Sequence, residues 1–313
     1  MRKRRAAVCI VLIIYGCFQA GVLGKFPGAP KYSLRWTDRK PIGSLIIATA
    51  ATNWRTNPRG WLLDPSIDIY TPNGLARFHD RLLAWADRSI GILKDMDAQG
   101  MITWDIEGEQ FPHPITYVGD PTLCTQLAPE MAGVVDEYFA RFRNAGFRVG
   151  VTVRPQQFRR TLSGGTQQNV SNPAEQLMRK IGYARQRWGA TLFYIDSNGY
   201  PGWPLGAEIV TQVARRYPDV LLIPEDKNVF YYAETALYSR LRKGVYSTPG
   251  LVRFLYPKAF SVIDTADGAI KDNFSELVAA ADRGDILMFR SWFADPANAI
   301  VKQICRQARI KAQ

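Results

Sequence analysis

Short apolar runs alternate with longer amphipathic stretches from Gly43 to about Arg309. The apolar runs have the length of buried β-strands. In the stretches between them, apolar residues recur on one helix face, as Leu82, Ile90 and Leu93 do within residues 76–99. The pattern therefore predicts strands and helices in regular alternation along the chain.

The predicted strands are 45–49, 101–107, 148–154, 192–196, 220–225, 245–248, 260–264 and 286–290. The predicted helices are 76–99, 130–145, 173–188, 206–217, 232–242, 273–283 and 296–309. Alternating strands and helices favour a parallel sheet that is covered by helices. Eight such units within residues 43–309 are typical of the α/β class and of a (β/α)8, or TIM, barrel.

The main alternative is an open, doubly wound α/β sheet. No G-x-G-x-x-G follows the first predicted strand, and no G-x-x-x-x-G-K-[ST] occurs anywhere in the sequence. Residues 43–309 contain no repeat and no linker-like segment, so we expect one barrel domain there. It would follow a lead-in over 25–42 and be followed by a tail over 310–313.

Residues 1–24 have the pattern of a secretory signal peptide. Met1–Arg5 is positively charged, residues 6–18 are apolar, and Val22–Gly24 provides small residues for cleavage. The apolar run is short for a membrane-spanning helix. We therefore expect a secreted or periplasmic protein. An uncleaved N-terminal anchor, which would be the one membrane contact, and a lipoprotein acylated at Cys17 are the alternatives.

Charge and composition narrow the partners. The net charge is +12, and four of the positive charges lie in residues 1–24, which leaves +8 for the rest. The basic residues are scattered rather than clustered, so nucleic acid is not an expected partner. The chain has two histidines and four cysteines, and we expect no metal and no cofactor. Cys124 and Cys305 would remain after signal cleavage, as a disulfide or as separate thiols.

Several of the apolar strands end in a charged residue. Asp196 ends the fourth predicted strand and Glu225 the fifth. Side chains alternate between the faces of a strand, so Tyr194 shares a face with Asp196, and Ile223 shares one with Glu225. In a barrel, the carboxyl ends of the strands form the active-site face. The two acids are therefore expected to lie close together at the mouth of the barrel.

Two carboxyl groups in one site are the basic requirement for cleaving a glycosidic bond. We expect Glu225 to be the proton donor and Asp196 to be the nucleophile or the stabilising carboxylate. A separation of about 5–5.5 Å would predict retention of anomeric configuration, and about 6.5–9.5 Å would predict inversion. The sequence thus predicts a secreted glycoside hydrolase whose partner is a poly- or oligosaccharide, and it carries no signal for an oligomeric state.

Further polar and aromatic residues near the strand ends are expected to bind the substrate. They are Asp105, Glu107, His113, Arg154, Asn198, Trp203, Asp264, Arg290 and Trp292. Aromatic rings beside carboxylates suit sugars, which present C–H faces and hydroxyl edges. For Arg154 and Arg290 the alternative is an ion pair that orients the acids.

Three segments carry a resemblance to known proteins. They are 104–108 (Trp-Asp-Ile-Glu-Gly), 194–199 (Tyr-Ile-Asp-Ser-Asn-Gly) and 223–226 (Ile-Pro-Glu-Asp). These segments resemble strand ends of secreted barrel glycoside hydrolases. From about residue 34 to 304, the chain is similar to exported bacterial proteins with a TIM-barrel fold that are described as glycoside hydrolases.

The distribution of acids is also similar to that of the α-amylase family. This resemblance implies that Asp196 is the nucleophile, Glu225 the acid/base and Asp264 a transition-state stabiliser. The sequence departs from that family at two motif positions. Tyr194 stands where the family has arginine, and Ile263 stands where it has histidine. The resemblance is therefore one of layout.

Other functions remain open at this point. One is a carbohydrate-binding barrel without catalysis, in which Asp196 and Glu225 lie too far apart or form ion pairs with Arg154 or Arg290. Another is a lyase or aldolase that forms a Schiff base on Lys227. The third is a metal-dependent enzyme that uses Asp105, Glu107 and Asp196.

Overall fold

The computed structural model describes residues 30–49, 53–108, 118–161, 164–200, 203–225, 228–241, 247–265 and 270–311. The chain divides into two units, Met1–Tyr32 and Ser33–Gln313. The predicted signal segment, 1–24, and residues 312–313 of the predicted tail lie outside the described residues. Every strand and helix among the described residues belongs to the second unit.

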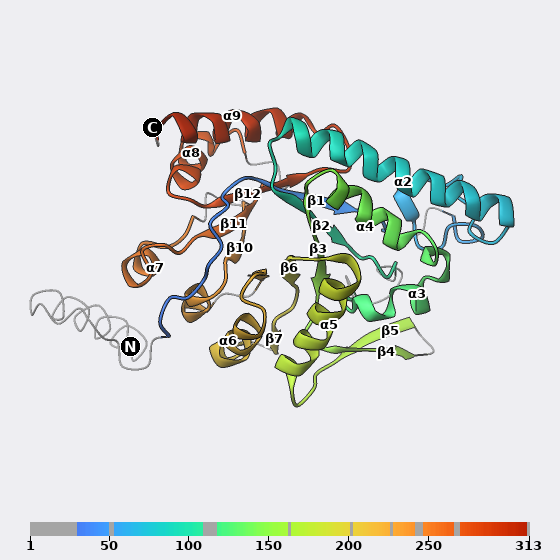
Figure 1. The fold of residues 1–313 in the computed structure, drawn as a ribbon, viewed down its shortest axis with the longest axis horizontal. Coiled ribbons are helices and arrows are strands. Elements are labelled where there is room, and N and C mark those ends of the chain that lie inside the picture. The colour runs from blue at the N-terminus through green and yellow to red at the C-terminus, as the bar shows by residue number, and fades with distance from the viewer. Residues whose placement is uncertain are drawn as a thin grey trace, which may run out of the picture. The chain divides into compact units, whose positions relative to one another are not determined.

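Eight strands form the main sheet of this unit (Figure 1). They are β1 (Ile42–Ile46), β2 (Gly100–Trp104), β3 (Arg148–Val153), β6 (Leu192–Ile195), β9 (Leu221–Pro224), β10 (Leu237–Arg240), β11 (Ser261–Asp264) and β12 (Ile286–Arg290). Their order is β10-β11-β12-β1-β2-β3-β6-β9, and each neighbouring pair is parallel. A hydrogen bond of 3.1 Å from the Ala236 N–H to the Leu222 carbonyl joins the first strand of this order to the last. The predicted (β/α)8 barrel is confirmed.

Helices surround the ring of strands (Figure 1). The longer ones are α2 (Pro72–Asp95), α4 (Val135–Asn144), α5 (Pro173–Trp188), α6 (Ala207–Arg216), α7 (Gly250–Leu255), α8 (Phe274–Asp282) and α9 (Pro296–Lys311). Short helices occur in the loops: η1 (Trp61–Leu63), η2 (Pro121–Leu123), α3 (Cys124–Leu127), η3 (Pro129–Met131) and η4 (Val229–Ala233). Two small hairpins lie beside the barrel, formed by β4 (Gln157–Thr161) with β5 (Gly164–Gln168) and by β7 (Gly199–Tyr200) with β8 (Trp203–Pro204).

Seven of the eight strands, all but β3, contribute alternate residues to a cluster inside the barrel. The cluster that they form contains Ile42, Ile102, Trp104, Leu192, Tyr194, Leu221, Ile223, Ala236, Tyr238, Phe260, Val262, Ile286 and Met288. Residues of the other parity, such as Val151 and Phe193, are also fully buried, because helices cover the outside of a parallel barrel. The strands are therefore apolar on both faces along most of their length.

Residues 33–41, which the sequence places in a lead-in, pack against the barrel. The side chains of Leu34 and Trp36 contact the inner cluster, and the Arg39 guanidinium lies over the ring of Phe260 at 3.6 Å from its centre. These residues precede β1, so they cover the end of the barrel at which the strands begin. The opposite end is left for the strand ends that carry the acids.

The sixth strand of the barrel differs from its prediction. Residues 232–242 were expected to be a helix and 245–248 a strand, whereas β10 is formed by Leu237–Arg240 and is preceded by η4. This prediction was wrong because Ala, Glu and Leu in this stretch favour a helix, while parallel pairing with β11 overrides that propensity. Residues 242–246 lie outside the described residues.

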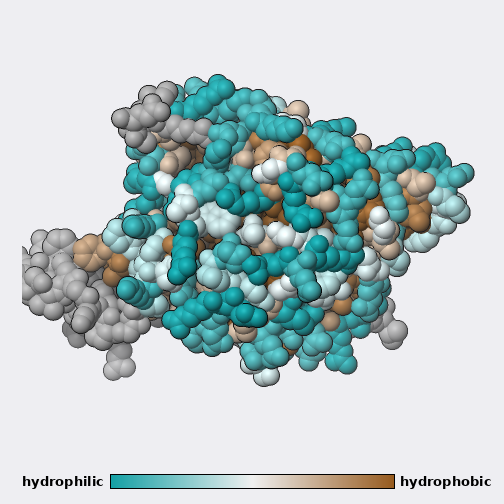
Figure 2. Space-filling view, in the orientation of Figure 1, coloured by the Kyte–Doolittle hydropathy of each residue, from teal (hydrophilic) through white to brown (hydrophobic). Residues whose placement is uncertain are grey.

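The face of the molecule in Figure 2 is largely hydrophilic, with hydrophobic residues in smaller areas between hydrophilic ones. In the described part of the chain, none of the helices combines the length and the hydropathy that a membrane crossing needs. Cys124 is buried, Cys305 is partly exposed, and the two do not form a disulfide with each other.

Candidate active site

Asp196 and Glu225 leave neighbouring strands toward the mouth of the barrel. Ile195 in β6 is paired with Pro224 in β9, so the next residues, the two acids, are also neighbours. The ladder continues through the Glu225 N–H, which donates to the Ile195 carbonyl at 3.0 Å. Tyr194 lies inside the barrel, and so does Ile223, which is two residues before Glu225. The alternation of the strands therefore directs both carboxyl groups above the inner cluster.

The two carboxyl groups are in direct contact. Their side chains form a hydrogen bond with each other, in which Asp196 donates and Glu225 accepts. Asp196 is 6% exposed, and the Glu225 side chain is 21% exposed. Carboxyl groups in contact are closer together than the separation of about 5–5.5 Å or more that glycosidases use. The pair as it stands leaves no room for a sugar between its members.

Arg154 holds Asp196 from the side of β3. Its Nε donates to Asp196 Oδ2 at 2.7 Å, and its Nη2 donates to the same oxygen. Both side chains are 8% exposed, so the ion pair is nearly excluded from solvent. The Arg154 N–H donates to the Gly119 carbonyl at 2.9 Å, and a Cβ at Gly119 would lie 2.7 Å from that nitrogen. The orienting ion pair, one of the two predictions for Arg154, is thus present.

Glu225 is held by groups on the other side of the pair. Its Oε2 accepts the Ser197 N–H at 3.1 Å, and its Oε1 forms an ion pair with Arg240. Ser197 has a left-handed backbone with φ of 51°, a conformation that costs a residue other than glycine about 1–2 kcal/mol. This strained turn directs its N–H at the carboxylate. Glu225 therefore sits among donors, as an ionised carboxylate requires.

Burial and these partners divide the charge of the pair unequally. Burial raises the pKa of Asp196 to about 6, although Arg154 acts in the opposite direction, and the contact with Glu225 raises it further. Burial alone would raise the pKa of Glu225, but the hydrogen bonds from Asp196 and Ser197 and the charge of Arg240 outweigh it and lower this pKa. The two pKa values are thus pushed apart, so the pair holds one proton, on Asp196, below about pH 6.

Two further predicted residues, Asp264 and Arg290, are the last residues of β11 and β12, and both have the inward parity of their strands. The Asp264 side chain accepts a hydrogen bond of 2.6 Å from the Tyr238 hydroxyl. Arg290 Nη1 donates to Asp295 Oδ2 at 3.2 Å, so its ion pair is with an acid that the sequence did not single out. Both side chains are partly exposed, on the same face of the barrel as the acid pair.

Trp292 and Asn198 lie near the same strand ends. Trp292 is partly buried and packs edge-on against Phe293, with 5.4 Å between ring centres. Asn198 is fully buried, and its carbonyl accepts the Leu205 N–H at 2.8 Å. Asn198 thus stabilises the loop after β6 and does not face solvent.

Asp105 and Glu107 are buried beyond the end of β2, and among the described residues they do not join Asp196 in a cluster of three acids. Trp104 lies inside the barrel, so the next residue has the opposite parity, and β2 ends there because Asp105 has a left-handed φ of 56°. Asp105 is 0% exposed and Glu107 is 1% exposed. The charged neighbours of Glu107 are Asp120 and Lys180, and burial together with Asp120 raises its pKa to about 7. Both acids are sealed from solvent.

Some predicted residues fall outside the described residues. They are His113 and the alternative nucleophile Lys227. The backbone of Trp203 forms part of β8, but its side chain is not described. Among the residues that are described, no three acids, cysteines or histidines come together as a metal site. The trio of Asp105, Glu107 and Asp196, which the metal-dependent alternative needs, does not form such a group.

The sequence analysis missed Arg240, which pairs with Glu225. Had Leu237–Arg240 been recognised as a strand, this arginine would have ended it as the acids end β6 and β9. Gln156 and Lys180, which contact the loops beneath the pair, were also missed. Lys180 carries a usable signal, because a lysine on the apolar face of a helix is rarely buried unless it is paired.

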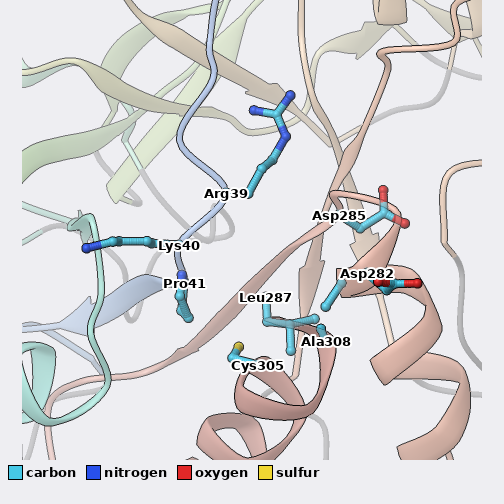
Figure 3. A pocket seen from close by; sticks show the side chains of 9 residues that line it. Arg39, Lys40, Pro41, Asp282, Asp285, Leu287, Cys305 and Ala308 are labelled. Carbon is cyan, nitrogen blue, oxygen red and sulfur yellow. The ribbon is translucent and has the colours of Figure 1, made fainter. Parts of the chain in front are cut away.

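A pocket in Figure 3 lies at the other end of the barrel. Its lining includes Pro41, which precedes β1, and Asp285, which precedes β12, together with Cys305 and Ala308 of α9. None of the predicted site residues lines it.

Comparison with solved structures finds 207 similar chains. No family model matches the chain, and no curated protein matches it. An α-fucosidase from Thermotoga maritima has 12% identity and a TM-score of 0.44 over 89% of this chain and 74% of that one. An α-galactosidase from Lactobacillus brevis has 11% identity and a TM-score of 0.45 over 88% of this chain and 40% of that one. An α-amylase from Lactobacillus plantarum has 11% identity and a TM-score of 0.45 over 88% of this chain and 80% of that one. Similarity at this level leaves the residues of the site as the basis for assigning a function.

Proposed function

We propose that the protein is a glycoside hydrolase that acts on a poly- or oligosaccharide with Asp196 and Glu225 as its catalytic pair. The observation that carries the proposal is the position of the two acids, which end neighbouring strands of the barrel. Two carboxyl groups at the mouth of a (β/α)8 barrel are in contact, and their pKa values are pushed apart. One neutral acid and one carboxylate are what cleavage of a glycosidic bond needs.

The charge distribution leads us to exchange the roles expected from the sequence. Of the two pKa values, that of Asp196 is the raised one, so Asp196 would protonate the leaving oxygen. Glu225 carries the charge and would face the anomeric carbon. A sugar can enter only if the two carboxyl groups separate. Arg154 and Arg240 hold them from opposite sides, so each keeps a cationic partner after separation.

The experiment is a screen of polysaccharides and aryl glycosides with the wild type, Asp196→Asn and Glu225→Gln. Glu276→Gln, at an exposed position on α8, is the matched control. We expect both site variants to lose turnover with an intact fold. The proton donor is dispensable for a dinitrophenyl leaving group, which departs without protonation. Asp196→Asn should therefore keep part of its activity on that substrate, and Glu225→Gln should not.

The opposite result, with only Glu225→Gln active on the dinitrophenyl glycoside, would restore the roles predicted from the sequence. A Glu225→Gln variant with near wild-type turnover on a cleaved glycan would contradict the proposal itself. Either result is read together with far-UV circular dichroism, so that loss of fold is recognised.

A carbohydrate-binding barrel without catalysis is the second candidate. Two observations favour it: the nearly buried Arg154–Asp196 ion pair, and the carboxyl contact that fills the space between the acids. Glycan binding in calorimetry without cleavage by the wild type, across the same panel, would support this candidate over hydrolysis.

The proposal includes export through residues 1–24. N-terminal sequencing of protein from a bacterial host that is secreting it should begin near residue 25. A mature chain that starts at Met1 would favour the uncleaved anchor.

A further inference from the structure

A lysine is buried beneath the acid pair. Lys180 lies on α5 and is 0% exposed, on the same helix face as Leu177, Ile181 and Ala184. Removing an ammonium group from water costs several kcal/mol unless partners replace the water. Leu or Met would fill this position without that cost. The question is therefore which contacts the buried charge makes.

The Lys180 ammonium binds the backbone just after β3. Its Nζ donates to the carbonyls of Arg154 and Gln156, each at 2.7 Å, and lies 3.7 Å from Asp120 Oδ2. Two neutral carbonyls and one carboxylate thus surround it. Burial lowers its pKa to about 8, with Asp120 opposing the shift, so the ammonium form predominates at neutral pH.

The two carbonyls belong to the residues whose side chains hold the acid pair. Arg154 donates to Asp196 through Nε at 2.7 Å. Gln156 Nε2 donates to the Ser197 carbonyl at 2.8 Å, and the Ser197 N–H donates to Glu225 at 3.1 Å. Two separate paths therefore lead from one ammonium group to the two carboxyl groups.

The second path ends on the strained turn. Ser197 has a φ of 51°, and the bonds from Gln156 and to Glu225 are the contacts that hold its two backbone polar groups. If the backbone at Gln156 moves, the amide of that turn loses its support. If the backbone at Arg154 moves, the ion pair on Asp196 changes its geometry. One buried side chain thus controls both.

We propose that Lys180 is a positioning residue that fixes Arg154 and Gln156 and thereby keeps the carboxyl groups of Asp196 and Glu225 in contact. Its effect on turnover rests on the proposed function, whereas its effect on the pair does not. Lys180 touches neither carboxyl group, so it acts only through the two residues that it holds. Glu107 and Asp120 belong to the same buried cluster and face Lys180 rather than the mouth.

The test follows the carboxyl groups directly. In protein labelled with ¹³C at Asp and Glu side chains, the Asp196 and Glu225 signals are titrated by NMR in the wild type, Lys180→Met and Lys180→Gln. Arg179→Met is the matched control, because Arg179 is the adjacent residue, carries the same charge and binds Asp120 without contacting either carbonyl. The two Lys180 variants guard against a single misfolded protein.

Lys180→Met should raise the lower apparent pKa of the pair by about one unit, since Glu225 loses both the hydrogen bond from Asp196 and the amide donor of Ser197. Lys180→Gln keeps one donor and should give a smaller shift in the same direction. Arg179→Met should change it by less than a third of the Lys180→Met shift. A folded Lys180 variant with the wild-type titration, or an equal shift in Arg179→Met, would overturn the proposal.

Turnover gives a second, separate readout. If a glycan is cleaved, Lys180→Met should lower kcat about tenfold or more, because Arg154 and the Ser197 amide no longer hold the two carboxyl groups in place after they separate. It should also lower KM, because the separation that admits the sugar becomes easier. If no glycan is cleaved by the wild type, the hydrolase proposal fails and the NMR titration still decides the role of Lys180.

Discussion

Acids follow the ends of β2, β6 and β9 in similar sequence settings. The surroundings of the acids after β2 differ from those of the acids after β6 and β9. Asp105 and Glu107 follow one apolar strand, and Asp196 and Glu225 follow two others. The first two are sealed among loops and helices, whereas Asp196 and Glu225 meet above the inner cluster of the barrel. An acid at a strand end is therefore not enough to indicate a site.

The difference follows from parity. Tyr194 and Ile223 point inward, and each acid of the pair comes two residues later. Trp104 also points inward, so Asp105 comes one residue later and has the outward parity, and its left-handed backbone then ends the strand. What decides the outcome is the position of the acid relative to the last inward residue of its strand.

The strongest test of this difference is the same substitution, Glu to Gln, at Glu225 and at Glu107. Glu225→Gln should lower turnover by about 10³-fold, within the range for a lost catalytic carboxyl group. Glu107→Gln should leave turnover within a factor of about three, because Glu107 touches neither Asp196 nor Glu225. Initial rates on a cleaved glycan measure both, with Glu276→Gln as the exposed control. A folded Glu107→Gln protein without turnover would show that the sealed acid takes part in the chemistry.

The second prediction concerns the cations that hold the pair. Arg154→Met leaves a nearly buried carboxyl group without its partner and should cost about 3–5 kcal/mol of unfolding free energy. Arg240→Met removes the partner of Glu225, but Arg240 is 45% exposed, so the cost should be below about 1 kcal/mol. Urea unfolding at pH 7 compares the two. Equal losses would mean that the two sides of the pair are equally buried in solution.

The third prediction compares how the buried Glu107 and the exposed Glu276 affect the pH dependence of stability. The pKa of Glu107 in the folded protein, about 7, lies above its ordinary value of 4.5. Between these two values the folded protein keeps a proton that the unfolded chain has lost. The stability that depends on this proton is fully present below about pH 4.5 and is lost as the pH rises to about 7. The change amounts to about 3 kcal/mol for such a shift.

Glu107→Gln cannot titrate, so it should lose this part of the fall in stability between pH 4.5 and 7.5. Glu276→Gln should keep the wild-type slope. Urea unfolding at intervals of half a pH unit measures both slopes. Identical slopes in the wild type and Glu107→Gln would show that Glu107 is ionised in the folded protein across this range.

Much of the fold could be predicted because a barrel strand is a local pattern. The apolar runs predicted seven of the eight strands near their observed positions, and parity predicted that Asp196 and Glu225 share a face. Leu237–Arg240 was missed because its strand form depends on pairing with β11, which is not a local property. Arg240 was missed with it.

The state of the pair was beyond local reasoning for a similar reason. Whether two carboxyl groups touch or stand apart depends on side-chain angles and on Arg154, Ser197 and Lys180, which come from other parts of the chain. Burial of Glu107 likewise depends on the loop that carries Asp120 and on α5. Parity indicates which way a side chain leaves the strand, and tertiary packing determines what it meets.

The smallest expected effect extends the comparison to Asp264, the acid that ends β11 with inward parity. Tyr238, in the neighbouring strand, donates its hydroxyl to Asp264 at 2.6 Å, as Arg154 donates to Asp196. Tyr238→Phe should cost about 1.5 kcal/mol, the usual size for a hydrogen bond to a charged group. Tyr232→Phe is the matched control, since its hydroxyl meets the Ser261 hydroxyl at 2.8 Å where β11 begins, away from the acids. Tyr232→Phe should lower the free energy of unfolding by about 1 kcal/mol or less and leave KM for a cleaved glycan unchanged. Tyr238→Phe should raise KM a few-fold, because Asp264 loses the hydrogen bond from Tyr238. If both variants change KM equally, inward parity at a strand end does not mark the residues that meet the substrate.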